Sequence, residues 1–239
     1  MRLSRTALLL ASALAAGARA TAAQTIPSPY EYIEATQSPG AFAGFIIADP
    51  DISISDSVSV PMGPRSGPVF GVRYQIRAAG PLSIEGGLGL LLTDRRLFDA
   101  EFDAETDVVT TTDLGTTVPA TVGMADVALR FHLTGPRTWN GLAPFVAGTG
   151  GFVGDLRGTF AEEEVAVDST EFFRFGPSFA VGAGLGTDWF PARNVSLRVE
   201  ASGRLWRMRT PSGFLPNPDA ERREWNPAVG VTVGGAIHF

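Results

Sequence analysis

Apolar and polar residues alternate along most of the chain after residue 40. In the stretch VFGVRYQIRA, residues 69–78, every second side chain is aliphatic or aromatic, and Gly, Arg and Gln stand between them. The last ten residues, GVTVGGAIHF, divide in the same way. A period of two residues is typical of a β-strand with one apolar face. The pattern therefore predicts strands.

Eight segments carry this alternation, and two of them, 41–48 and 142–154, alternate less cleanly. The predicted strands are 41–48, 69–78, 82–93, 124–133, 142–154, 173–189, 195–205 and 229–239. The long links between them are 49–67, 98–118, 155–171 and 210–226, and the short links are 78–81, 134–141 and 191–194. Long and short links alternate without a break. Tight turns at one end and long loops at the other indicate an up-and-down antiparallel barrel.

A water-soluble, lipocalin-like barrel would show the same alternation, with its apolar face inward. Two observations favour lipid outside. The polar face mixes charges of both signs with Gly and Ser, which suits a crowded interior. The apolar face carries aromatic residues near strand ends, as membrane barrels do at both interfaces: Phe70, Phe131, Phe145, Phe173, Trp189, Trp225 and Phe239. In lipid every backbone polar group must be paired, so the first strand must meet the last. The predicted fold class is all-β, an eight-stranded antiparallel up-and-down transmembrane β-barrel.

The chain divides into three predicted parts. Residues 1–23 have the layout of a cleaved secretory signal peptide, with two early arginines, a short apolar stretch and A-x-A spacing. A short membrane anchor is the alternative. Residues 24–39 form a periplasmic segment that either tucks against the barrel mouth or hangs free. Residues 40–239 form the barrel, with both ends in the periplasm, and the expected location is the bacterial outer membrane.

Composition excludes several functions. The net charge of -6 argues against a nucleic-acid partner, and the absence of Cys excludes thiolate metal sites. The runs GTGGFVG and GAGLG lie inside predicted strands, so they are not expected to bind a cofactor. We expect no catalytic residue and no metal or cofactor site. The two histidines, His132 and His238, lie on the inward parity, and a lipid A-modifying enzyme is the third-ranked function.

The sequence resembles the small outer-membrane barrels of the OmpA/OmpX type over residues 40–239. The resemblance rests on the signal peptide, the eight strands, the loop pattern and the terminal VGVTVGGAIHF. It implies that the final strand is the signal read by the barrel-assembly machinery, through Val231, Val233, Ile237 and Phe239. No peptidoglycan-binding domain follows the barrel in this sequence, so a cell-wall tether is not expected.

An eight-stranded barrel has an interior just wide enough for side chains to fill. The inward parity predicts a lumen charge network made of Arg73, Arg77, Glu85, Asp126, Arg130, Arg174, Asp188, Arg198, Glu200 and Arg204. Buried charges must be paired, so we predict an Arg–carboxylate plug. A narrow pore lined by the same charges is the alternative. The leading function is structural or surface interaction, by a monomer that contacts outer-membrane lipid and lipopolysaccharide. Acidic residues of the long loops could share divalent cations with lipopolysaccharide.

Overall fold

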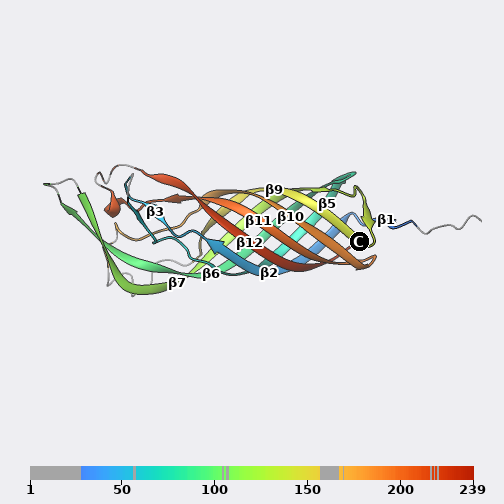
Figure 1. Cartoon of the computed structure of the whole chain (residues 1–239), viewed down its shortest axis with the longest axis horizontal. Coiled ribbons are helices and arrows are strands. Elements are labelled where there is room, and N and C mark those ends of the chain that lie inside the picture. Colours follow the sequence, from blue (N-terminus) through green and yellow to red (C-terminus); the bar gives the residue numbers. More distant parts are fainter. Residues whose placement is uncertain are drawn as a thin grey trace, which may run out of the picture.

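The computed structural model describes residues 28–55, 58–103, 105, 108–156, 167–168, 170–215, 217, 219 and 221–239. Eight long strands form one closed ring (Figure 1), in which each is antiparallel to its neighbours and the last pairs with the first. In ring order they are β2 (Gln37–Ala48), β5 (Gly67–Ala79), β6 (Leu82–Asp103), β7 (Val108–His132), β9 (Leu142–Asp155), β10 (Ser178–Ala192), β11 (Val195–Arg209) and β12 (Arg223–Ile237). The predicted fold class is confirmed.

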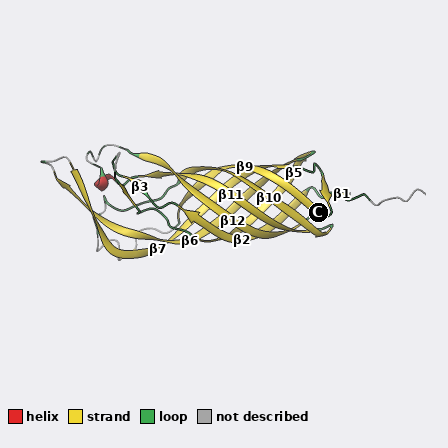
Figure 2. Ribbon diagram, in the orientation of Figure 1, coloured by secondary structure: helices red, strands yellow, loops and turns green. Residues whose placement is uncertain are grey.

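Short secondary-structure elements lie at the two ends of the ring. They are β1 (Tyr30–Tyr32), β3 (Ile52–Ser53), β4 (Ser59–Val60), β8 (Arg137–Trp139) and the single 3₁₀ turn η1 (Ser212–Phe214). Figure 2 shows how little of the described chain is other than strand. In the described part of the chain, no helix has the length and apolar character needed to cross a membrane.

The outer face of the ring is an exposed apolar belt. Aliphatic side chains such as Leu185 and Val231 are more than half exposed although they lie in the middle of long strands. Aromatic residues border the belt, and on β10 they are Phe179 and Trp189, ten residues apart. At the rise and tilt of barrel strands this separation spans about 25 Å, the height of the apolar band of membrane barrels. Lipid is therefore the medium that this face fits.

Two aromatic residues that we expected at the interfaces lie elsewhere. Phe145 points into the lumen and is only 1% exposed, and Phe173 is buried in the loop before β10. In β9, small residues occupy both faces of the strand, so the alternation of residue types did not indicate that the Phe145 side chain points inward. The predicted strand 173–189 begins only at Ser178, because Gly176 adopts a positive φ of 95° that ends the extended run.

The short-turn end of the barrel is covered by the N-terminal segment. β1 pairs with β8, the N–H groups of Thr36 and Gln37 donate to the Phe239 carbonyl, and the Arg77 guanidinium donates to the Ile33 carbonyl. The described part of this segment is therefore docked against the short-turn opening of the barrel. β2 begins at Gln37, three residues before the expected start of the barrel. The predicted signal peptide, residues 1–23, lies outside the described residues.

At the opposite end, β6 and β7 continue far beyond the other strands as a two-stranded hairpin (Figure 1). The prediction of a loop at 98–118 is wrong, because β6 runs to Asp103 and β7 starts at Val108. The acidic residues of this stretch alternate with Phe98, Ala100 and Phe102, while the returning strand is rich in Thr and Val. That combination is compatible with a solvated strand pair.

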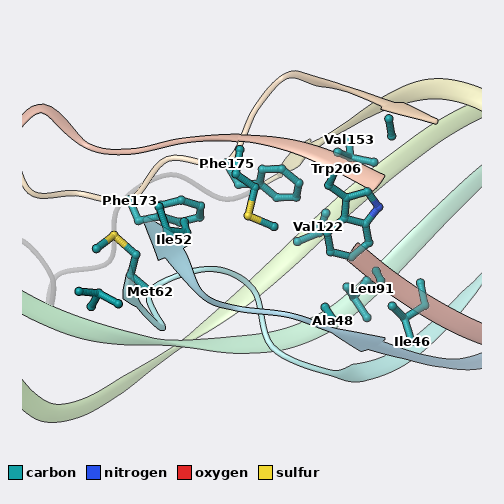
Figure 3. Packing of buried hydrophobic residues seen from close by; sticks show 14 of the residues in the cluster. Ile46, Ala48, Ile52, Met62, Leu91, Val122, Val153, Phe173, Phe175 and Trp206 are labelled. Carbon is teal, nitrogen blue, oxygen red and sulfur yellow. The ribbon is translucent and has the colours of Figure 1, made fainter. Parts of the chain in front are cut away.

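The described parts of the remaining loops fold inward and fill the long-loop opening of the barrel. Side chains from the first, third and fourth long loops meet residues of the ring in one buried apolar cluster (Figure 3). Its centre is Trp206, which is fully buried and packs against Phe175 with ring centroids 5.7 Å apart. Phe173 stacks on Phe175, and Phe214 of η1 closes the cluster from the loop side. We call these residues the mouth cluster.

Candidate functional site

The barrel interior below the mouth cluster holds the charged side chains, and Arg198 of β11 lies at their centre. Its Nε donates to Asp188 Oδ1 at 2.5 Å, and its Nη1 donates to Glu85 Oε2 at 2.6 Å. Its Nη2 donates to Gln75 Oε1 at 2.7 Å. One guanidinium thus joins β5, β6, β10 and β11 across the lumen. The planar fork of donors in Arg makes such multiple pairing possible.

Arg130 of β7 completes the ring of charges. Its Nη2 donates to Glu85 Oε1 at 2.7 Å and to Glu200 Oε2 at 2.8 Å. Arg73 of β5 approaches Glu200 from the other side, with Nη1 to Oε2 at 3.6 Å. We call Arg73, Glu85, Arg130, Asp188, Arg198 and Glu200 the charge layer. All six side chains are buried.

Phe145 forms the apolar floor on which the charge layer is stacked. The Arg130 and Arg198 guanidinium carbons lie 4.4 and 5.1 Å from the centroid of its ring. Cations over an aromatic face are stabilised by the ring quadrupole, most strongly where water is excluded. The ring thereby covers the Arg130 Nε and Nη1 atoms, which have no hydrogen-bond partner among the described residues.

Inward glycines make room for these long side chains. A Cβ placed on Gly234 of β12 would collide with Arg73 Nη2, and one on Gly186 of β10 would lie 2.7 Å from the Phe145 ring. Gly184, also on β10, faces Glu200 Oε1 at 3.2 Å in the same way. The Gly-rich runs inside the strands are therefore packing positions beside the charge layer.

The charges balance better than the sequence indicated. The ten predicted residues contain six arginines and four carboxylates, but two of the arginines lie outside the network. Arg174 is exposed in the loop before β10, so its predicted place in the lumen is wrong. Arg77 lies at the short-turn end and donates to the Ile33 carbonyl. Arg204 and Asp126 pair at 3.0 Å above the charge layer. Counted together with the charge layer, this pair gives four arginines and four carboxylates in the lumen.

Three further lumen residues lie outside the predicted charge network: the sequence placed Gln75 and His132 on the inward parity and Phe145 on the outward one. Gln75 and Phe145 are described above, and His132 places Nε2 3.7 Å from Asp188 Oδ2 and Nδ1 3.2 Å from the Pro81 carbonyl. The inward parity of β5 and β7 carried a usable signal for Gln75 and His132, because both alternate with exposed apolar neighbours. For Phe145 the sequence held no such signal.

A serine and a histidine meet near the short-turn end. His238 Nε2 lies 2.7 Å from Ser196 Oγ, and the His238 ring is 4.9 Å from that of Phe190. Ser196 is 1% exposed and its side chain points into the lumen. The pair resembles the nucleophile and base of a hydrolase in its hydrogen bond alone. Substrate access to Ser196 from the lipid face is blocked by the barrel wall.

A small cavity of about 40 Å³ separates the charge layer from the Arg204–Asp126 pair. Charged residues such as Arg73, Glu85 and Glu200 line it together with apolar residues such as Phe42, Leu88 and Met124, so it is partly polar. A space of this size holds one or two water molecules. Within the described residues the lumen is therefore occupied by side chains over two successive levels, the charge layer and the mouth cluster.

No protein-family model matches the sequence, and no curated protein matches it. Solved structures similar to this chain include Neisserial surface protein A, with 12% identity, 89% of this chain and 98% of that chain covered, and a TM-score of 0.45. Ail of Yersinia pestis, in complex with the heparin analogue sucrose octasulfate, shows 9% identity, coverage of 85% and 99%, and a TM-score of 0.39. The outer membrane protein W of E. coli shows 12% identity, coverage of 86% and 100%, and a TM-score of 0.39.

Proposed function

We propose that this chain is an integral outer-membrane barrel with a closed lumen, whose role is structural or is exerted by its surface-exposed loops. The observation that carries the proposal is that two successive layers of side chains fill the barrel interior. The charge layer spans the lumen from Arg73 to Arg198, and the mouth cluster around Trp206 fills the space above it. An ion that crossed this interior would have to displace both levels.

The location follows from the outer face. An apolar belt about 25 Å high, bordered by aromatics, requires lipid, and closed barrels of this kind belong to the outer membrane. Membrane fractionation and gels of boiled and unboiled samples test it. We expect the protein in the outer-membrane fraction, with a shift in mobility on boiling. A soluble protein without such a shift would overturn the proposal.

Conductance in planar bilayers separates a closed barrel from a small pore. We expect no reproducible single-channel steps from the purified protein, while a porin of 16 or more strands conducts in the same bilayer as a positive control. Stable steps of uniform size would contradict the closed lumen. They would favour the alternative, in which water in the partly polar cavity becomes part of a narrow path.

The structural and surface roles can be distinguished in cells. A strain that lacks the protein is tested for entry of a large antibiotic that an intact outer membrane excludes. It is then complemented with the full chain or with a variant in which residues 101–110 are replaced by a two-residue turn, which leaves Phe98 in the buried apolar cluster. Equal rescue by both supports a structural role of the barrel itself. Rescue by the full chain alone assigns the role to the hairpin, and failure of both to rescue refutes a contribution to envelope integrity.

Absence of lipid A modification remains an expectation of this proposal. Mass spectrometry of lipid A from cells with and without the protein tests it directly. We expect identical spectra. Loss of an acyl chain in the expressing cells, abolished by Ser196→Ala, would instead make the Ser196–His238 pair catalytic.

A further inference from the structure

Three arginines lie on the outer surface where β11 and β12 rise above the apolar belt. Along these paired strands the outward rows are Leu205 beside Pro227, then Arg207 beside Trp225, then Arg209 beside Arg223. All three arginine side chains are exposed. The wall of the barrel thus changes from apolar to cationic within two rows. We call Arg207, Arg209 and Arg223 the arginine rim.

The arginine rim carries more positive charge than its own carboxylate neutralises. Arg209 and Arg223 face each other directly and share Glu221, at 3.4 and 2.9 Å. Like charges opposite each other on paired strands are destabilising. Two other exposed arginines at this end each have a carboxylate of their own, in the Arg65–Asp94 pair at 3.4 Å and the Arg96–Asp113 pair at 3.3 Å. The surplus charge of the rim is therefore available to an external anion.

The height of the arginine rim is that of lipid headgroups. Ala180 pairs with Trp206, so Phe179 of β10 lies at the level of Arg207, and Trp225 lies on the other side of it. Aromatic residues of this kind mark the boundary between hydrocarbon and headgroups. The phosphate groups of a lipid in the adjoining leaflet would stand at the level of the arginines.

An apolar groove of about 670 Å³ lies on the same wall below the arginine rim. Its floor is formed by small side chains and its borders by large ones; among its lining residues are Phe45, Ala183, Leu185, Ala201, Gly203 and Val229. A Cβ placed on Gly203 would meet no atom within 4 Å, so the floor is open to the surroundings. Gly203 and Arg207 are separated by about 13 Å along β11.

We propose that the arginine rim and this groove together bind one phosphorylated lipid of the outer leaflet, with phosphate at Arg207, Arg209 and Arg223 and an acyl chain in the groove. Guanidinium groups bind phosphate oxygens through charge-assisted and bidentate hydrogen bonds. The acyl chain fills a depression that the flat packing of bulk lipid would cover poorly. The site rests on the proposed outer-membrane location and not on the closed lumen.

Binding of lipid A to the purified barrel in detergent micelles tests the site. The probes are lipid A with both phosphates and the same lipid after enzymatic removal of the phosphates, and binding is read by native mass spectrometry. The rim variant combines Arg207→Gln and Arg223→Gln, and its control is Arg96→Gln. The groove variant is Gly203→Leu, and its control is Gly86→Leu, an exposed glycine of β6 that also has open space around it.

We expect the rim variant to weaken binding of phosphorylated lipid A about tenfold or more, and to leave the dephosphorylated lipid unaffected. The groove variant should weaken binding of both lipids, and neither control should change either. A mobility shift on boiling verifies that each variant is folded. Equal binding of the two lipids by the wild type would overturn the phosphate contact. Full binding by folded Gly203→Leu, or full displacement by millimolar inorganic phosphate, would overturn the joint site. Because the assay uses detergent, its result is independent of the fractionation that tests the location.

Discussion

Arg198 and Asp188 stand directly opposite each other on β11 and β10, joined by two hydrogen bonds of 2.5 and 3.1 Å from one guanidinium to one carboxylate. They are ten residues apart in the chain, across the short turn that connects the two strands. A hairpin thus brings its own ion pair to the centre of the lumen. Both side chains are buried away from water, so the charge of each is stabilised by the other.

Removal of Arg198 should destabilise the barrel strongly. Arg198→Met leaves Asp188 and one Glu85 oxygen without their cation in a site closed to water, and such a loss costs about 3–5 kcal/mol. Urea unfolding of the refolded protein in detergent, followed by tryptophan fluorescence, measures it. The exposed Arg96→Met should change the free energy of unfolding by less than about 1 kcal/mol. Similar losses in both variants would contradict the role of the charge layer.

Adding Asp188→Leu to Arg198→Met should recover part of the lost stability. The second change removes the carboxylate that the first change left unpaired, and paired apolar replacements of buried ions are often neutral. Unfolding of the double variant under the same conditions checks this expectation. A further loss in the double variant would show that the two side chains act independently.

Glycines on the two faces of the barrel wall give a second pair of matched variants. Gly234→Ala places a methyl group against the Arg73 guanidinium and the Ala41 carbonyl, and the expected destabilisation is about 1–3 kcal/mol. Gly148→Ala, on the outer face with no atom within 4 Å, should be neutral or slightly stabilising. Unfolding midpoints of the two proteins decide the matter. Equal midpoints would mean that the lumen can repack around the added methyl.

The long-loop end should hold together better in acid. Burial and the neighbouring Asp99 carboxylate raise the pKa of Glu171, a loop residue that packs beside η1. A raised pKa means that the docked loop binds the proton more tightly than the free loop does. This stabilisation is present at low pH and is lost as pH rises through the raised pKa. Proteolysis of the loop at pH 4.5 and pH 7.5 measures it, and slower cleavage is expected at pH 4.5.

Glu171→Gln imitates the protonated carboxyl and should remove this dependence. Cleavage of the variant loop should be slow at both pH values, after correction for the protease's own activity on an unfolded substrate. Asp113→Asn serves as the control, since Asp113 is an exposed carboxylate at the same end of the barrel that is not among the charges raising the Glu171 pKa. A pH effect that persists in Glu171→Gln would assign it to another group.

Phe239 should matter more for assembly in the cell than for folding in detergent. Its N–H donates to the Gln37 carbonyl at 3.1 Å, and its ring is exposed beyond the end of β12. Phe239→Asp keeps the backbone contact and removes the aromatic end of the final strand. We expect a severalfold lower yield in the outer membrane and an unchanged extent of refolding in detergent. Phe239→Tyr is the conservative control, and equal loss in both assays would contradict an insertion signal.

The alternation of residues was sufficient to predict the ring, because each strand of a barrel has one face in lipid. The alternation did not predict the structure where neither face of a strand contacts lipid. Beyond Leu92, both faces of the β6–β7 hairpin leave the belt, so acidic residues and threonines could be mistaken for a loop. The run Phe173, Arg174, Phe175 imitates a strand, but its two rings are anchored in the mouth cluster.

The candidate site was predicted in composition but not in connectivity. Parity identifies which charges point inward, as for Arg130 and Glu85. The partner of each charge depends on the shear of the barrel, which brings β6 and β11 together across the lumen at the level of Arg198. Tertiary placement of this kind has no local signature. The same holds for the arginine rim, where Arg209 and Arg223 are neighbours only through the pairing of β11 with β12.

The β6–β7 hairpin extends the barrel wall as a two-stranded stem at the long-loop end. From Leu92 to Asp103, β6 runs about 35 Å beyond the last exposed leucine of the belt, paired with β7 throughout most of that length. A peptide spliced between Asp103 and Val108 would be carried at the end of this two-stranded stem, away from the apolar belt. The barrel is in this respect a ready display scaffold, in which the anchor and the presented sequence are separated by a paired stem.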